Sequence, residues 1–291
     1  KGAALAGEMQ SPAYLSRRAL LKGLYPAGDP ALREATPGTV GSLSLSDVKA
    51  YYDNVFRPDM TTVVIVGQVS PETAASVVGK YFGRWEAVGP KPETDPAPVP
   101  ENPPSATLVP DDSRVQDEVR LVQTVGITRI HPDYYALQLG NHVLSGGFYA
   151  TRLYRDLREQ SGLVYSVESS VEAGKTRARF LVYFASDPGK ASVARAMVER
   201  NLRRMQTDLV TAAELRQART LLLRQIPLSE SSLDGIAQGL LHRAVVDLPL
   251  DEPVRAARRY LDLSAGGIRA AFARWVRPRG FVQVTTGPPP R

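Results

Sequence analysis

Cysteine is absent from this 291-residue sequence, and histidine occurs only three times. The lack of cysteine excludes disulfides, thiolate metal sites and Cys–His catalysis. No run of about 18 apolar residues is present, so we expect no membrane-spanning helix. Lys1 to Gln10 lack the apolar stretch of a signal peptide. The compartment stays open between cytoplasm and a cysteine-poor periplasm, and we favour the periplasm.

The three histidines, His131, His142 and His242, are far apart in the sequence. A His-x-x-Glu-His or His-Glu-x-x-His helix would place two imidazoles on one face for zinc, with a glutamate beside the metal-bound water. No such pattern is present, and neither is a Gly-x-Ser-x-Gly elbow or a glycine-rich phosphate loop. The sequence therefore predicts no metal ligand, no bound cofactor and no catalytic residue in this chain.

The charge balance is basic, with 36 Lys and Arg against 30 Asp and Glu and a net charge of +6. Such an excess can indicate an acidic partner such as nucleic acid. Here, however, arginines alternate with acids in helical stretches such as residues 195–208. This mixture is typical of a solvated helix face with near-neighbour ion pairs, so we predict no nucleic-acid partner.

A proline-rich stretch, PKPETDPAPVPENPP at 90–104, interrupts the chain. Its proline density disfavours a helix or a central strand and favours an extended linker. We therefore predict three parts: residues 1–89, a linker over 90–106, and a second domain over 107–291.

Two segments on either side of this linker share one plan. Residues 43–67 align without a gap on residues 263–287, a shift of 220 positions. Each segment has a serine suited to cap a helix, an apolar helical face, an Arg-Pro pair and a β-branched run that ends in glycine. The pairs are Arg57-Pro58 and Arg277-Pro278. We interpret the match as an internal duplication.

The duplication predicts a truncated first copy. If the second copy begins near residue 107, the first would begin about 220 positions earlier, roughly 110 residues before Lys1. We therefore expect the chain to open inside its first domain.

Hydrophobic periodicity predicts an α+β fold with mixed-sheet layers and helices on one side. Strands are expected at 61–67, 115–126, 163–171, 177–186 and 281–286. Helices are expected at 11–24, 46–56, 71–82, 132–143, 149–159, 189–206, 211–225, 231–246, 253–261 and 265–275.

The most informative segment is SGGFYATRLYRDLREQSGLVYSV, residues 145–167. It resembles the C-terminal domain of pitrilysin and insulinase-type zinc peptidases, and of the related mitochondrial processing peptidase and respiratory core subunits. Residues 131–147, 55–72 and 214–227 extend the resemblance over nearly the whole chain. The resemblance implies two related mixed-sheet-plus-helix domains, here with the first one incomplete, and an inverted His-x-x-Glu-His motif in the first domain.

The resemblance also implies that an arginine and a tyrosine seven residues apart bind the substrate backbone. Arg158 and Tyr165 have this spacing, and Arg155 is the second choice for the arginine. Guanidinium and phenol groups can both donate hydrogen bonds to a carbonyl oxygen. Arg158 could instead pair with a neighbouring acid, and Tyr165 could be a core aromatic. The glycine pair Gly146-Gly147 is expected to shape a turn.

The resemblance implies a function in peptide hydrolysis. We expect a fragment or subunit of a zinc-dependent metalloendopeptidase that supplies the Arg/Tyr half, while the zinc site lies outside this chain. Its partners would be a peptide substrate and a zinc-bearing subunit in a homo- or heterodimer, as in bacterial members where one subunit carries zinc and the other the Arg/Tyr pair. The alternatives are a non-catalytic partner subunit and a structural core-type subunit, so the sequence leaves open whether the chain is itself an enzyme.

Overall fold

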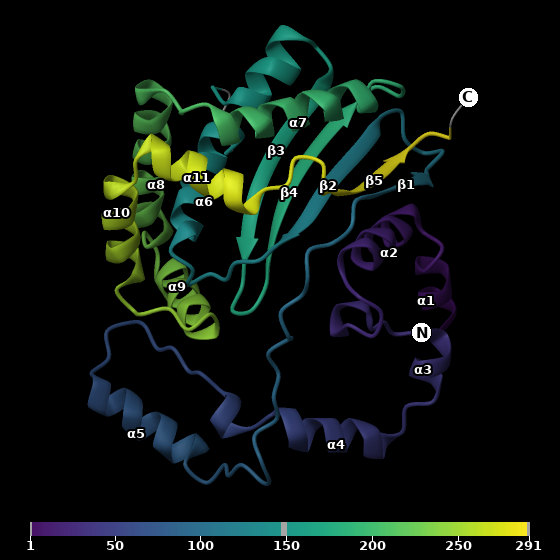
Figure 1. Cartoon of the computed structure of the whole chain (residues 1–291). Helices are drawn as coiled ribbons and strands as arrows, with labels where there is room; N and C mark the ends of the chain where they lie inside the picture. The colour runs from purple at the N-terminus through teal and green to yellow at the C-terminus, as the bar shows by residue number, and fades with distance from the viewer. Residues whose placement is uncertain (1, 147–149, 290–291) are drawn as a thin grey trace.

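The computed structural model describes residues 2–146 and 150–289. Helices, loops and the long proline-rich linker make up the region before residue 105, and a sheet with covering helices makes up the rest (Figure 1). The first region contains α1 (Gly2–Glu8), α2 (Pro12–Leu24), η1 (Pro30–Leu32), α3 (Pro37–Gly41), α4 (Leu45–Val55), η2 (Pro58–Met60) and α5 (Pro71–Phe82).

The second region is built on a mixed five-stranded sheet in the order β1-β5-β2-β4-β3. β1 pairs with β5 in parallel, and the other neighbours are antiparallel. The strands are β1 (Ser105–Pro110), β2 (Asp117–Val125), β3 (Val164–Ala173), β4 (Ala178–Ser186) and β5 (Val282–Gly287). The helices are α6 (Asp133–Leu144), η3 (Tyr154–Gln160), α7 (Ala191–Thr207), α8 (Ala212–Ser229), α9 (Leu233–Val245), α10 (Glu252–Asp262) and α11 (Ala265–Trp275).

The main hydrophobic core lies between one face of the sheet and the helices α6, α7 and α11. Phe180 on β4 meets Phe272 on α11 edge-on, with ring centroids 6.2 Å apart. Phe180 and Phe281 also lie 6.3 Å apart. Both Phe272 and Phe281 are completely buried. These aromatic contacts fix the helix layer on the sheet, because each ring buries a large apolar area.

α2 covers part of the opposite face of the sheet, although it comes from the first region of the chain. Leu24 at its end packs with Val122 and Val282. A Cβ atom at Gly23 would lie only 2.5 Å from a methyl group of Val282, so the helix approaches β5 closely because this residue has no side chain. The first region is therefore anchored to the second through α2.

The α+β class with a mixed sheet is confirmed. The strand predicted at 61–67 is wrong, because these residues lie outside any strand. Val63 and Ile65 are about half exposed, and none of the described strands pairs with them. A β-branched run gives strand propensity, but a strand also needs a hydrogen-bonded neighbour. The division into domains stays a prediction.

Two further expectations need correction. The strand β1 was not predicted, because Ser105–Pro110 follows directly on the proline-rich stretch and is mostly exposed at the edge of the sheet. The helix predicted at 149–159 is a π-helix over Tyr154–Gln160, preceded by a short helical turn. Residue 149 lies outside the described residues.

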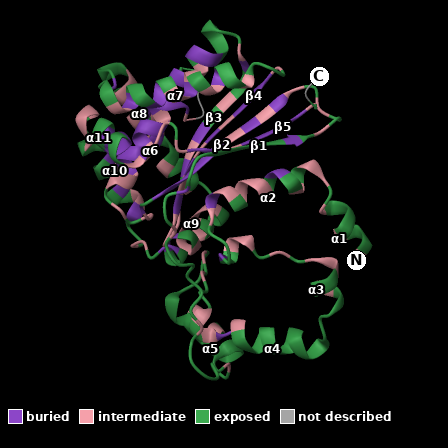
Figure 2. Ribbon diagram, turned by 45° about the vertical axis from the view of Figure 1, so that its right-hand side comes forward, coloured by how far each residue is buried: buried purple, intermediate pink, exposed green. Residues whose placement is uncertain are grey.

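The duplicated segments have the same local start but different surroundings. Ser44 caps α4 by accepting the backbone N–H of Asp47, and Ser264 caps α11 by accepting that of Gly267. Val48 on α4 is 54% exposed, whereas its counterpart Ile268 on α11 is fully buried. Figure 2 shows α4 exposed along its length. Among the described residues, the second copy packs its apolar face against a sheet and the first does not.

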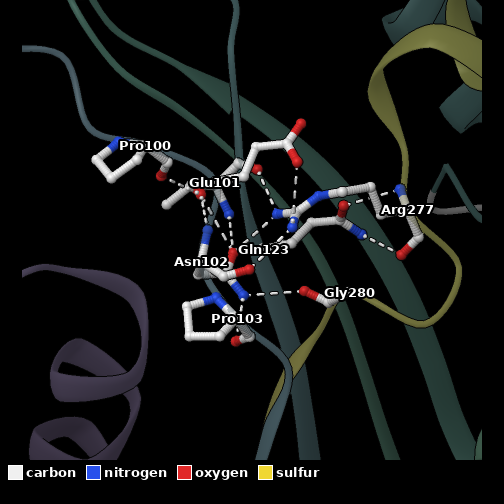
Figure 3. A network of polar contacts seen from close by, with 8 residues as sticks. Pro100, Glu101, Asn102, Pro103, Gln123, Arg277 and Gly280 are labelled. Atoms are coloured by element: carbon white, nitrogen blue, oxygen red, sulfur yellow. Dashed lines mark hydrogen bonds and ion pairs between the residues drawn. The ribbon is translucent and has the colours of Figure 1, made fainter.

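The matching arginines of the two copies each hold one end of the linker. Arg57 is 3% exposed and donates to the carbonyl oxygens of residues 88–90 at 2.8 to 3.1 Å. Arg277 donates to the carbonyl oxygen of Asn102 at 2.8 Å (Figure 3). It also donates to the carbonyl oxygen of Thr124 at 3.1 Å. The planar guanidinium fork suits several carbonyls at once. The two aligned segments thus share a contact with the linker.

The middle of the linker is also attached, at the tip of the β3–β4 hairpin. Arg177 donates to the carbonyl oxygen of Ala97 at 2.6 Å, and Lys175 pairs with Asp95 at 2.7 Å. The linker, whose residues 91–104 form neither helix nor strand, is therefore held at several points along its length.

Candidate functional site

Arg158 and Tyr165 lie together at one end of the sheet. Arg158 belongs to the π-helix Tyr154–Gln160, and Tyr165 is the second residue of β3. The guanidinium carbon of Arg158 lies 5.6 Å from the centroid of the Tyr165 ring, a cation–π contact. Arg158 is exposed and Tyr165 is 47% exposed. Both side chains are therefore accessible to a ligand.

Three irregularities of the backbone bring the pair together. The π-helix carries Arg158, and Gly162 turns the chain with a φ of +58°. A register shift between Val164 and Ser166 then places a bulge at Tyr165. π-helices and β-bulges are uncommon and are enriched at functional sites, where they direct a side chain away from its regular position.

The hydrogen bonds of the pair show which donors are free. Arg158 Nη1 donates to the carbonyl oxygen of Val164 at 3.1 Å, which leaves other guanidinium N–H groups available. The Tyr165 hydroxyl donates to Asp187 Oδ1 at 2.6 Å, and Lys190 Nζ lies 2.7 Å from Asp187 Oδ2. The pair therefore belongs to a group of four charged or polar side chains.

The electrostatics of this group keep the phenol protonated. The hydrogen bond to Asp187, followed by the charge of that carboxylate, raises the pKa of Tyr165 above its ordinary value. Lys190 and then Tyr165 lower the pKa of Asp187. At neutral pH the site thus contains an ionised carboxylate and a neutral phenol that can donate a hydrogen bond.

Sequence reasoning missed Asp187 and Lys190. They belong to Asp187-Pro188-Gly189-Lys190, directly after β4, and Gly189 has a φ of +84°. An Asp-Pro-Gly turn at the end of a strand is a recognisable signal. Its contact with Tyr165 spans 22 residues of sequence and could not be read from local spacing.

The neighbouring arginines have different roles. Arg152 is 5% exposed and forms a two-pronged ion pair with Glu214, with both N–O distances at 2.8 Å. Burial works to raise the pKa of Glu214, but hydrogen bonds from Arg152 and the Thr211 backbone lower it to about 2. Arg155 is half-exposed, and its Nε lies 3.4 Å from Asp156 Oδ1. Arg158 is the arginine that contacts Tyr165.

The contacts of the pair differ from those expected for a surface ion pair or a core aromatic. Within residues 2–146 and 150–289, Arg158 forms no ion pair with Asp156 or Glu159. Asp156 is buried and accepts a hydrogen bond from Asn201 at 3.1 Å. Tyr165 is not a core aromatic, because almost half of it is exposed.

The histidines are engaged separately. His131 Nδ1 accepts the backbone N–H of Asp133 at 3.1 Å, and its ring meets Trp275 edge-on. His142 is mostly buried, its Nδ1 lies 3.2 Å from the Gln138 carbonyl oxygen, and burial lowers its pKa. His242 lines a cavity of about 590 Å³ near α2 and the β3–β4 hairpin.

Neither a metal site nor a membrane span is found in the described part of the chain. Across these residues no group of three or more histidines, aspartates and glutamates is placed to hold a metal ion. Zinc therefore has no fitting ligand set here. None of the described helices is long and apolar enough to cross a membrane.

The glycine turn after α6 is only partly described. A Cβ atom at Gly146 would lie 2.4 Å from the Cα atom of His142, which explains why this position has no side chain. Gly147 lies outside the described residues.

Solved structures share this architecture. A peptidase M16 inactive domain from Pseudomonas fluorescens superposes with a TM-score of 0.85 and 24% identity, over 99% of this chain and 68% of that one. A protease from Helicobacter pylori gives 0.84 and 18%, over 98% and 70%. A chain of complex III2 from Candida albicans gives 0.78 and 15%, over 98% and 69%. At these identities the likeness shows the fold.

Sequence comparison gives relatives and a family. An uncharacterized zinc protease of Mycobacterium leprae is 25% identical over 206 residues, 69% of this chain and 44% of that protein. A probable inactive metalloprotease of Bacillus subtilis is 21% identical over 215 residues, 73% and 49%. The chain thus spans about half the length of these relatives. Residues 42–222 match the family described as the peptidase M16 inactive domain, which confirms the pitrilysin-type resemblance. This chain belongs to the peptidase M16 inactive-domain family.

Proposed function

We propose that this chain supplies the substrate-binding half of a zinc-dependent metalloendopeptidase, with Arg158 and Tyr165 binding the peptide backbone. The observation that carries the proposal is the exposed pair itself. A π-helix and a bulge hold the guanidinium carbon of Arg158 5.6 Å from the centroid of the Tyr165 ring. Hydrolysis would take place at a metal site formed by residues outside those described. A peptide and a zinc-bearing subunit would be the partners.

The contacts of the pair suit a peptide carbonyl. Arg158 uses one N–H group on Val164 and can direct others outward. The Tyr165 hydroxyl can turn from Asp187 to the ligand, because Lys190 still balances the Asp187 carboxylate. Two donors would then hold one carbonyl oxygen. They would also stabilise negative charge that develops on that oxygen during hydrolysis.

A structural role without peptide binding is the second candidate. Its support is the fold shared with a chain of complex III2 and the relative named a probable inactive metalloprotease. Such a role requires the core and the surface, but not the Arg158–Tyr165 pair. The two candidates therefore differ in what removal of these side chains should do.

The test uses Arg158→Ala and Tyr165→Phe in an assembly that contains the zinc-bearing half. Losing either donor should lower the rate of peptide cleavage about 10²-fold, because each serves the developing oxyanion. Melting temperatures should not change, since both side chains are exposed. Arg155→Ala is the matched control and should keep the full rate. Full activity in both test variants would support the structural role instead.

A further inference from the structure

A second cavity opens at the same end of the sheet as Tyr165. Its volume is about 770 Å³, a size common for ligand pockets. β4 ends at Ser186, Asp187 accepts the Tyr165 hydroxyl, and the next residues, Pro188 and Gly189, line the cavity. One short turn therefore joins the cavity to the Arg158–Tyr165 pair.

The walls of this cavity are mostly apolar, and its charged lining residues are Arg114 and Asp117. Arg114 is already neutralised, because its Nε donates to Asp111 Oδ2 at 2.9 Å and its Nη1 to Glu118 Oε1. Asp117 has no such balance: in the described ranges it forms no ion pair with a cation. The apolar wall includes Leu108, Val115, Pro188 and Pro288.

Asp117 is a buried carboxylate, 8% exposed, at the first position of β2. Burial raises its pKa above the ordinary value, and the backbone N–H of Gly189 partly opposes this increase. A Cβ atom at Gly287 would lie 2.1 Å from Asp117 Oδ1, so glycine at that position leaves room for the carboxylate. A poorly solvated carboxylate that faces a cavity, with no cationic partner among the described residues, is stabilised by a cation that enters.

We propose that this cavity is a subsite for a basic side chain of the bound peptide, with Asp117 as the residue that selects the cation. The apolar wall would cover the methylene stem of an arginine or lysine. The Asp117 carboxylate would accept charge-assisted hydrogen bonds from its guanidinium or ammonium group. The inference rests on the proposed function, because the same peptide would be held by Arg158 and Tyr165.

The experiment measures binding of short peptides to this chain by fluorescence anisotropy. The probes are fluorescein-labelled nine-residue Ala/Ser peptides with one arginine moved through each position, and the same peptides with citrulline, which has nearly the same shape and no charge. At one or two adjacent positions arginine should bind about tenfold more tightly than citrulline.

Asp117→Asn should reduce this preference to about twofold or less and leave citrulline binding unchanged. Asparagine keeps an oxygen for the Gly189 N–H and removes the charge, so the fold should persist. A second variant avoids the core altogether: Val115 is 83% exposed, and Val115→Lys should also reduce the arginine preference by placing a cation at the rim. Tyr165→Phe should weaken the binding of arginine peptides and citrulline peptides by the same factor.

The outcomes separate the two proposals. Equal binding of arginine and citrulline peptides, or a preference that survives Asp117→Asn, overturns the basic subsite and leaves the proposed function standing. The absence of binding for every peptide overturns both.

Discussion

At the scale of single residues, the candidate site depends on one carboxylate shared by two donors. Asp187 accepts the Tyr165 hydroxyl on one oxygen and lies 2.7 Å from Lys190 Nζ on the other. Because Lys190 remains bound, the phenol can leave Asp187 without exposing an unbalanced charge. Asp187 and Lys190 thus act as positioning residues for Tyr165, and this arrangement can be tested by titration.

Asp187→Ala should lower the pKa of Tyr165 toward its ordinary value of 10.0, because the hydrogen bond to Asp187 is the main cause of the increase. The measurement is an NMR titration of tyrosine Cζ signals from about pH 8 to about pH 11.5, which brackets the ordinary tyrosine range. Tyr14 is the matched control: its pKa is raised by a hydrogen bond to Glu34 and should not move. An unchanged pKa for Tyr165 would show that Asp187 does not hold it in solution.

At the scale of helices and strands, signals that are local in the sequence predicted most helices. Features that depend on long-range contacts were not predicted. The helix starts at Ser44 and Ser264 were readable because the capping serine stands beside the helix it caps. Residues 61–67 failed as a strand because pairing depends on a neighbour that local sequence does not name. The edge strand β1 was hidden by the proline-rich sequence before it.

The same distinction holds for the candidate site. The resemblance pointed to Arg158 and Tyr165 because they lie in one continuous motif, seven residues apart, and the fold brings their side chains into contact. Asp187 was missed because folding brings it to Tyr165 from the end of β4, 22 residues along the chain. Likewise, the proline-rich composition predicted a segment without helix or central strand, but not the guanidinium groups that hold it.

The linker contacts lead to a prediction for Arg277. Arg277→Ala would remove the donors to Asn102 and Thr124, and should lower the free energy of unfolding by about 2 kcal/mol, since buried carbonyls lose their partners. Arg277→Lys should recover only part of this, because an ammonium group cannot reproduce the planar fork. Urea unfolding measures the change.

Arg279→Ala is the control for Arg277, because its side chain is 82% exposed and it lies on the same loop. It should change stability by less than about 0.5 kcal/mol. If Arg277→Ala proved as stable as this control, the contacts of Arg277 with the linker would contribute nothing measurable to stability.

At the scale of the whole molecule, the two aligned segments, residues 43–67 and 263–287, show how similar sequences behave in different surroundings. The same helix plan is fully packed in one copy and largely exposed in the other. In both copies an arginine side chain donates hydrogen bonds to the linker backbone. The similar sequences of the two segments therefore give the same capped helix, whereas the burial of that helix depends on what each copy packs against. The effect of one substitution should differ accordingly between equivalent positions.

Val48→Asp and Ile268→Asp place the same charge at positions 220 residues apart. Ile268 is fully buried, and a Cβ atom at Gly140 would lie 2.7 Å from one of its methyl groups, so this contact has no room for a hydrated carboxylate. Ile268→Asp should cost more than about 4 kcal/mol and abolish cooperative unfolding of the sheet region, because it buries an unpaired charge.

Val48 is 54% exposed, so Val48→Asp should change stability by no more than about 0.5 kcal/mol. It should also reduce binding of a hydrophobic dye, since it breaks the exposed apolar face of α4. Thermal unfolding and dye fluorescence of the two variants, measured side by side, test both effects. Equal destabilisation would mean that α4 is packed in solution as α11 is, and that the contrast in burial between the two copies is wrong.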